Sequence, residues 1–295
     1  MKWVITKDVA GYSVQKFLKD KHAFSRRLLR SLKDDGGSIE VNSELLSFRY
    51  KLQEGDIVNV TFPSEKVAAY MEPAPIPLTI IYEDEELMVV NKEAGMATLP
   101  SRNHPSHTLA NGILAYYRDK GIRSTIHIVT RLDKDTSGLV LIAKNRYIHG
   151  LFARMQQSHL IKRTYIAIVN GQPVKQRGVI NAPIGRKEGS IIERTVTFDG
   201  KEAITDYNIL HTDVNGDYSF AEIGIHTGRT HQIRVHMAYI GHPLIGDDLY
   251  SEKHPYIDRQ ALHCYRLTFQ HPLTKHELTI EAPIPADMSV FYKHG

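Results

Sequence analysis

Apolar residues near the amino terminus follow first a helical and then a strand period. Positions three and four apart are apolar over 14–18 and again over 28–32, which predicts two amphipathic helices, the second capped by Ser25. Polar and apolar residues alternate over 38–42 and 56–60, which predicts two short strands. We therefore expect a small α/β unit of two helices followed by a β part.

Proline at every second position from Pro73 to Pro77 is typical of an extended connector. With this connector as the boundary, we predict an N-terminal domain at 1–63, a linker at 64–77 and a larger domain at 78–295. The larger part has few predicted helices, one beginning at Asn145 and another capped by Thr230. Its strand-like runs lie at 80–82, 87–90, 139–143, 165–169, 220–225 and 277–280. This pattern predicts a mixed α+β domain with a large, mainly antiparallel sheet.

The composition excludes several classes of protein. With 295 residues, 42% of them apolar, the chain is large enough for about two domains with buried cores, so a disordered chain is excluded. The single cysteine, Cys264, cannot form an internal disulfide or a thiolate zinc site. The first twelve residues lack the continuous apolar stretch of a secretory signal, and no apolar run reaches the length of a membrane span. We expect a soluble, cytoplasmic protein without membrane association.

Basic side chains gather in the two predicted N-terminal helices. Between Lys16 and Lys33 lie seven lysines and arginines and one aspartate, a local charge of +6 against +4 for the whole chain. Such a face can bind RNA phosphates, or it can be an ordinary solvated helix face. The RNA-binding interpretation assigns phosphate contacts to Arg26, Arg27, Arg30 and Lys33.

The order of the N-terminal elements favours RNA binding. A helix, Ser25-Arg26-Arg27, a basic helix, the strand 38–42 and then 52–58 resemble the alpha-L RNA-binding motif of a small-subunit ribosomal protein and of many RNA-modifying enzymes. Ser43 stands where that motif usually has Gly after Val-Asn, a departure that bears on the turn. The resemblance implies an N-terminal RNA-binding domain.

A charged loop directly before a buried strand is the main candidate for chemistry. Residues 130–138 precede the apolar run 139–143, and functional sites commonly lie on such loops. Asp133 has three interpretations: an Asx-turn into the strand, part of an Asp-x-Asp phosphotransferase loop, or a carboxylate nucleophile. The phosphotransferase loop fits poorly, because it follows an apolar strand directly and Thr130 and Arg131 intervene here. An aspartate is ionised at neutral pH and needs positioning more than activation.

Several separate segments, between about residues 80 and 288, resemble the RluA-type pseudouridine synthases and follow that family's order. The central motif is Arg131-Leu132-Asp133-x-x-Thr136-Ser137-Gly138-Leu139, and the others lie at 82–95, 162–171, 227–236, 241–247, 259–263 and 269–272. Thr130 stands where the family usually has His, and Glu93 where it usually has Pro. We expect these departures to change loop geometry or substrate preference rather than activity.

The resemblance implies an isomerase that converts uridine in RNA to pseudouridine without a cofactor or a metal. It assigns Asp133 as the essential aspartate, Arg234 as the arginine paired with it and Tyr165 as the active-site tyrosine. The aspartate either attacks the ribose anomeric carbon or removes a ribose proton, and the sequence leaves both routes open. In this reaction the target base leaves its stack, and Arg131 matches the arginine that, in the family, can fill the vacated space. Arg229 is expected to bind RNA phosphates.

Three histidines lie close together in the sequence at 226, 231 and 236. Residues five apart on a helix diverge by roughly 140°, and His226 precedes the predicted cap, so we predict no metal site.

Two other functions remain open from the residues alone. One is an RNA-binding or ribosome-assembly factor without activity. The other is a carboxylate glycosidase using Asp133 and Asp135, which the basic first unit disfavours. For the isomerase, the implied partner is large-subunit ribosomal RNA or transfer RNA, with the N-terminal domain favouring ribosomal RNA, and we expect a monomer without a nucleotide cofactor.

Overall fold

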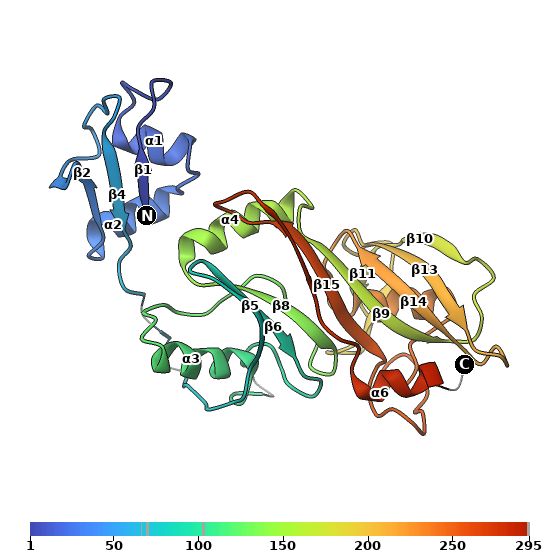
Figure 1. Cartoon of the computed structure of the whole chain (residues 1–295). Coiled ribbons are helices and arrows are strands. Elements are labelled where there is room, and N and C mark those ends of the chain that lie inside the picture. Colours follow the sequence, from blue (N-terminus) through green and yellow to red (C-terminus); the bar gives the residue numbers. More distant parts are fainter. Residues whose placement is uncertain (66, 69–70, 102–103, 294–295) are drawn as a thin grey trace.

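The computed structural model of the chain describes residues 1–65, 67–68, 71–101 and 104–293. Its N-terminal part is a four-stranded antiparallel sheet in the order β1-β4-β2-β3, accompanied by two helices (Figure 1). The elements are β1 (Lys2–Val4), α1 (Val14–Asp20), α2 (Arg26–Asp34), β2 (Ser38–Val41), β3 (Glu44–Leu45) and β4 (Ile57–Thr61). The side chain of Ser25 accepts a hydrogen bond from Leu28 N at 3.1 Å, which confirms it as the cap of α2. Strand β1 was not predicted, because three residues are too few to show a period.

The turn between β2 and β3 holds the residue that departs from the alpha-L pattern. Asn42 and Ser43 both have left-handed backbones, with φ of 52° and 69°. The Asn42 side chain donates to Asp56 at 2.8 Å and accepts from Ile57 N at 2.9 Å. Ser43 therefore adopts the conformation that usually favours glycine in such a two-residue hairpin turn.

A ten-stranded sheet forms most of the remaining fold (Figure 1). Eight strands follow the order β10-β13-β14-β9-β15-β8-β6-β5, with β16 paired to β15 and β7 paired to β8. The strands are β5 (Thr79–Glu83), β6 (Leu87–Lys92), β7 (His127–Ile128), β8 (Ser137–Ala143), β9 (Lys162–Asn170), β10 (Arg177–Asn181), β13 (Ile204–Thr212), β14 (Tyr218–Ile225), β15 (Leu262–Gln270) and β16 (Glu277–Glu281). Strands β8 and β15 pair in parallel, and the other pairs are antiparallel. The predicted α+β class with a mixed, mainly antiparallel sheet is confirmed.

Two short strands and several helices complete the chain. Strands β11 (Ile184–Arg186) and β12 (Arg194–Val196) pair with each other, and the helices are α3 (Leu109–Asp119), α4 (Arg146–Gln157), α5 (Gln232–Tyr239), α6 (Ala286–Ser289) and the 3-10 helix η1 (Val290–Lys293). Asn145 caps α4 as predicted. Helix α3 was not predicted, because Gly112 interrupts its apolar pattern where Ile76 packs closely against it. The helices of the described residues lack the length and apolar character needed to cross a bilayer.

The prediction that Thr230 caps the helix containing Arg234 is wrong. Helix α5 begins one residue later, with His231 as the residue before it. The side chain of Gln232, inside the helix, accepts hydrogen bonds from Thr227 Oγ1 at 2.7 Å and from Arg229 N at 3.0 Å. The turn before α5 is therefore stabilised by a side chain of the helix itself, and Thr230 is exposed.

An aromatic contact joins the N-terminal part to α4. The ring of Tyr147 packs against Phe24 and Phe62, with centroids 4.6 and 5.7 Å away. Its hydroxyl donates to the carbonyl of His22 at 2.9 Å, and Arg154 donates to the carbonyl of Ala23 at 2.8 Å. The N-terminal part of the chain therefore contacts α4 through these side chains.

Candidate active site

The Asp133 loop joins β7 to β8, and its backbone is held on both sides of the aspartate. Thr98 Oγ1 donates to the carbonyl of Leu132 at 2.8 Å, and Lys92 Nζ donates to the carbonyl of Lys134 at 2.9 Å. The side chain of Asp133 between them is 30% exposed. A carboxylate that is fixed at its base and open at its tip is arranged to reach a bound molecule.

Lys92 is a buried lysine beneath this loop, 1% exposed. Its ammonium group also donates to the carbonyls of Glu93 and Met96, both at 2.8 Å, so all three donors are used. Burial lowers the pKa of Lys92 to about 7, against the opposing charges of Asp135 and Asp133. Sequence analysis gave this lysine no role, although a lysine that closely follows the apolar run 87–90 was the available signal.

Gly138 fixes the direction in which the loop enters β8. Its φ is +115°, and a Cβ there would lie 2.3 Å from the carbonyl oxygen of Cys264 on β15. Strands β8 and β15 approach so closely that a side chain at this position has no room. The glycine of the central motif is therefore required by packing.

Arg234 is buried on α5 and is held mainly by Asp247. Its Nε and Nη2 donate to the two Asp247 oxygens at 2.7 and 2.6 Å, and Nη2 also contacts Asp248 at 3.3 Å. Burial disfavours the charged form, but the hydrogen bonds and charge of Asp247 outweigh it and raise the pKa of Arg234. Its Nη1 lies 3.7 Å from Asp133 Oδ2, so the structure brings the predicted arginine and aspartate together.

Tyr165 lies on β9 between Ile223 of β14 and Cys264 of β15, and it is buried. Burial raises the pKa of Tyr165, with smaller contributions from Cys264 and Asp133. The tyrosine therefore stays neutral, and the negative charge of Asp133 favours this form. Two residues earlier, Arg163 shares this face of the strand by the period of two. Sequence analysis missed Arg163, although that spacing was available as a signal.

The guanidinium group of Arg163 contacts the turn that precedes α5. It donates to the carbonyl of Thr227 at 3.4 Å, and one of its nitrogens lies 3.1 Å from where a Cβ of Gly228 would be. Its Nε is buried without a hydrogen-bond partner among the described residues. Arg163 is therefore a further cation beside the predicted tyrosine.

The two arginines predicted to contact RNA near the aspartate are both exposed. Arg131 is two residues before Asp133 in the same loop. Arg229 lies in the turn before α5, where its Nε donates to the carbonyl of Glu202 at 2.8 Å. Both side chains are therefore available to an incoming polyanion.

The predicted N-terminal RNA contacts lie on α2, in the N-terminal part of the chain (Figure 1). Arg26, Arg27, Arg30 and Lys33 are all exposed, and Arg30 pairs with Asp34 at 3.1 Å. The inward face of the helix is made by Leu28, Leu29 and Leu32. The basic side chains are thus free of the core and point away from it.

The three neighbouring histidines have separate environments. His226 pairs with Asp206 at 2.7 Å, His231 lies near Asp133, and His236 is buried against Thr205. No group of three or more His, Cys, Asp or Glu side chains in the described residues is arranged to hold a metal ion.

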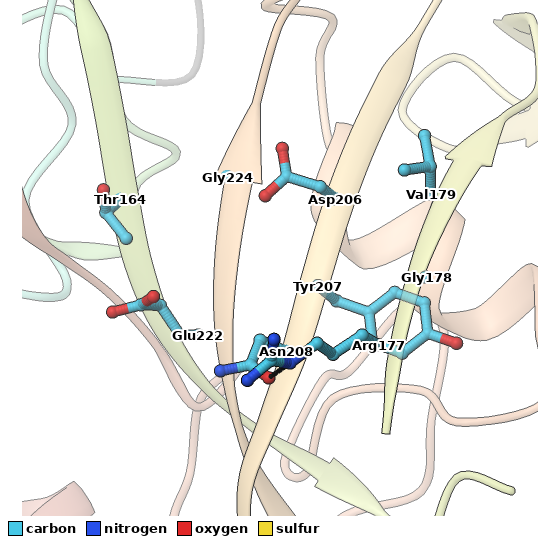
Figure 2. Close-up of a pocket in the computed structure, with 9 residues that line it drawn as sticks. All are labelled: Thr164, Arg177, Gly178, Val179, Asp206, Tyr207, Asn208, Glu222 and Gly224. Carbon is cyan, nitrogen blue, oxygen red and sulfur yellow. Dashed lines mark hydrogen bonds between the residues drawn. The ribbon is translucent and has the colours of Figure 1, made fainter. Parts of the chain in front are cut away.

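An open hollow of about 650 Å³ lies on the large sheet (Figure 2). Its lining comes from β9, β10, β13 and β14: Thr164, Arg177, Gly178, Val179, Asp206, Tyr207, Asn208, Glu222 and Gly224. Neighbouring residues of a strand point to opposite faces, so the hollow at Thr164 lies on the face opposite to Tyr165. It is not part of the Asp133 site.

Comparison with known proteins gives consistent matches. A model of the family described as RNA pseudouridylate synthase matches residues 86–239. The chain is 47% identical over 269 residues to the uncharacterized RNA pseudouridine synthase YjbO of Bacillus subtilis (strain 168), covering 91% of this chain and 94% of that protein. It is 35% identical over 306 residues to the ribosomal large subunit pseudouridine synthase D of Zymomonas mobilis, covering 98% and 95%. Among solved structures, it is similar to human RNA pseudouridylate synthase domain containing 1, with a TM-score of 0.59 and 26% identity over 72% of this chain and 86% of that one.

Proposed function

Because the chain belongs to the RNA pseudouridine synthase family, of the RluA type, we propose that it isomerises uridine in large-subunit ribosomal RNA, using Asp133 as the reacting carboxylate. Membership of this family makes the protein an RNA-modifying enzyme. It argues against the two other functions considered from the sequence, an RNA-binding factor without activity and a carboxylate glycosidase. Transfer RNA is the second candidate substrate. Support for ribosomal RNA comes from the relative named ribosomal large subunit pseudouridine synthase D, which aligns over 98% of this chain, N-terminal domain included.

The observation that carries the catalytic proposal is the placement of Asp133. Its loop is tied to Thr98 and Lys92, and its carboxylate faces the guanidinium of Arg234 at 3.7 Å. A nearby cation keeps a carboxylate charged as a substrate excludes water. In one route an Asp133 oxygen bonds to C1′ as the bond to N1 breaks. In the other, Asp133 removes a ribose proton as the bond from C1′ to N1 breaks, which gives a glycal-like intermediate and a free uracil.

In both routes the uracil turns and its C5 bonds to C1′. In the first route the bond from Asp133 to C1′ breaks at this step, and in the second Asp133 returns the proton to the ribose. The hydrogen of C5 is then lost and N1 gains a proton. Nothing is oxidised, and no outside group is transferred. We assign Tyr165 to stack on the uracil or to assist the proton transfer, since its buried hydroxyl stays protonated. Moving the base out of its stack costs roughly a few kcal/mol, and we assign Arg131 to fill the space that the base leaves.

Phosphate contacts are assigned to Arg229 and to the exposed face of α2, whose members are Arg26, Arg27, Arg30 and Lys33. Contacts of this kind position an RNA without reading its sequence and weaken as salt rises. We also propose that the chain acts as a monomer, because the Asp133 site is built from one chain.

The test is to map pseudouridine in all cellular RNA with and without the protein. We expect uridines of large-subunit ribosomal RNA to lose modification, and a loss confined to transfer RNA would refute the substrate proposal. Asp133→Asn should abolish the activity and leave RNA affinity within a few-fold. Asp135→Asn, in the same loop, is the matched control and should stay active; a normally active Asp133→Asn would overturn the catalytic assignment.

A further inference from the structure

His231 has a backbone conformation that its helix does not require. Its φ of 57° and ψ of 21° are left-handed, and its side chain makes no capping hydrogen bond to a described residue of α5. This conformation costs a residue other than glycine about 1–2 kcal/mol, and Ser, Thr, Asn or Asp would cap a helix better. The contacts of the side chain must therefore offset the cost.

The hydroxyl of Tyr250 contacts one of the two ring nitrogens of His231. The phenol oxygen already accepts a hydrogen bond from Arg194 N at 2.8 Å, and it lies 3.0 Å from His231 Nδ1. A phenol that already accepts one hydrogen bond has its own proton free to donate, and donation to Nδ1 would leave the neutral imidazole with its proton on Nε2. That nitrogen lies 4.0 Å from Asp133 Oδ2.

A separation of 4.0 Å is too long for a direct hydrogen bond, but it accommodates one oxygen atom bound to both groups. The oxygen must accept a proton from His231 and donate one to Asp133. A ribose hydroxyl has both capacities. Since Arg234 and His231 both approach Oδ2, Oδ1 is left to react.

On the basis of the proposed function, we propose that His231 and Asp133 together bind the 2′-hydroxyl of the target ribose, with His231 Nε2–H donating to O2′ and the hydroxyl donating to Asp133. This contact places the carboxylate beside C1′ and C2′, which suits both catalytic routes. It also lets the site recognise RNA rather than DNA at the reacting nucleotide.

Protonation of His231 should disrupt this arrangement. Charged groups face the imidazole from every side: Asp133 on the loop, Arg234 on α5, Asp247 after α5 and Arg194 on β12. Burial lowers the pKa of His231, so the neutral form dominates at neutral pH. The protonated ring would lose the hydrogen bond from Tyr250 and pair directly with Asp133, so activity should fall in acid.

The experiment uses the full chain and bulk RNA labelled with [5-³H]uridine in cells that lack the protein, because loss of the C5 hydrogen releases tritium. His231→Leu removes the donor and should lower kcat/KM about 100-fold. His231→Gln keeps an N–H donor and should stay within about tenfold, with a flatter fall in acid. Tyr250→Phe keeps the ring beside Arg234 but loses the hydrogen bond to Nδ1 that favours the neutral imidazole. The activity of this variant should therefore begin to fall at a higher pH than that of the wild type. RNA affinity should stay within a few-fold in all three.

Equal activity of His231→Leu and His231→Gln, or an unchanged acid limb in both His231→Gln and Tyr250→Phe, would overturn the inference. If His231→Leu does not fold, the other two variants still decide. Asp133→Asn, assayed beside them, separates the failures: if it is active, the catalytic assignment is wrong, whereas if it is inactive and the His231 variants are normal, only this inference fails. Bulk RNA makes the result independent of which RNA is modified.

Discussion

Asp247 holds Arg234 by two hydrogen bonds of 2.6 and 2.7 Å, and this buried pair, rather than Asp133, sets the position of the guanidinium. Asp133 lies further away, at 3.7 Å. Arg234 is thus anchored on one side and presents its remaining nitrogen to the candidate reacting carboxylate. The charge balance of the site therefore depends on Asp247 as well as on Arg234 and Asp133.

Asp247→Ala should destabilise the protein strongly, because it leaves a buried guanidinium without its main partner. We expect a loss of about 3–5 kcal/mol in the free energy of unfolding, measured by urea denaturation, and at least a tenfold loss of activity. Asp248→Ala is the control, since that side chain is 69% exposed and should cost about 0.5 kcal/mol or less. Equal losses for the two variants would contradict this role of Asp247.

Lys92→Met should loosen the Asp133 loop. The change removes the ammonium group that binds three partly buried carbonyls, which is partly offset by the removal of a buried charge, and we expect a net loss of about 2 kcal/mol. Hydrogen exchange in 131–136 should become faster. Lys134→Met removes an exposed ammonium but keeps the carbonyl that Lys92 binds, so it should leave both measurements unchanged.

Gly138→Ala should be among the most damaging small substitutions. The new Cβ would lie 2.3 Å from a backbone atom of Cys264, in a backbone conformation that alanine avoids. We expect a loss of about 3 kcal/mol or more in thermal or urea unfolding, with loss of activity. Gly150→Ala in α4 is the matched control: no described atom lies within 4 Å of its Cβ position, and it should stabilise the protein by about 0.5–1 kcal/mol.

The stability of the protein should fall in acid because of His263. Burial and the charge of Arg259 lower the pKa of His263 from 6.5 to about 4. Between these values the unfolded chain binds more protons than the folded one, so the free energy of unfolding falls as pH falls through this window, by about 3 kcal/mol in total. Urea denaturation across the window should show a flatter dependence for His263→Gln, whereas His276→Gln, at an exposed position, should follow the wild type.

Local patterns predicted many of the elements correctly. The caps Ser25 and Asn145 and the buried run of β8 follow from propensity and from neighbours within a few residues. The errors occurred where a distant contact decides the conformation. Helix α5 begins after His231 because Gln232 stabilises the preceding turn, and α3 contains a glycine because Ile76, far away in the sequence, packs against it.

The sequence by itself determined the α+β class, the family resemblance and the candidate residues Asp133, Tyr165 and Arg234, because these depend on side-chain type and order along the chain. Only the tertiary structure decided which groups support them. Lys92 binds three backbone carbonyls, a group that every residue carries, so no side-chain pattern marks its partners. His231 lies 98 positions after Asp133 in the printed sequence, and the residues next to either one give no sign of the contact. Contacts to backbone atoms and between distant segments leave no local pattern, so they become visible only when the chain is folded.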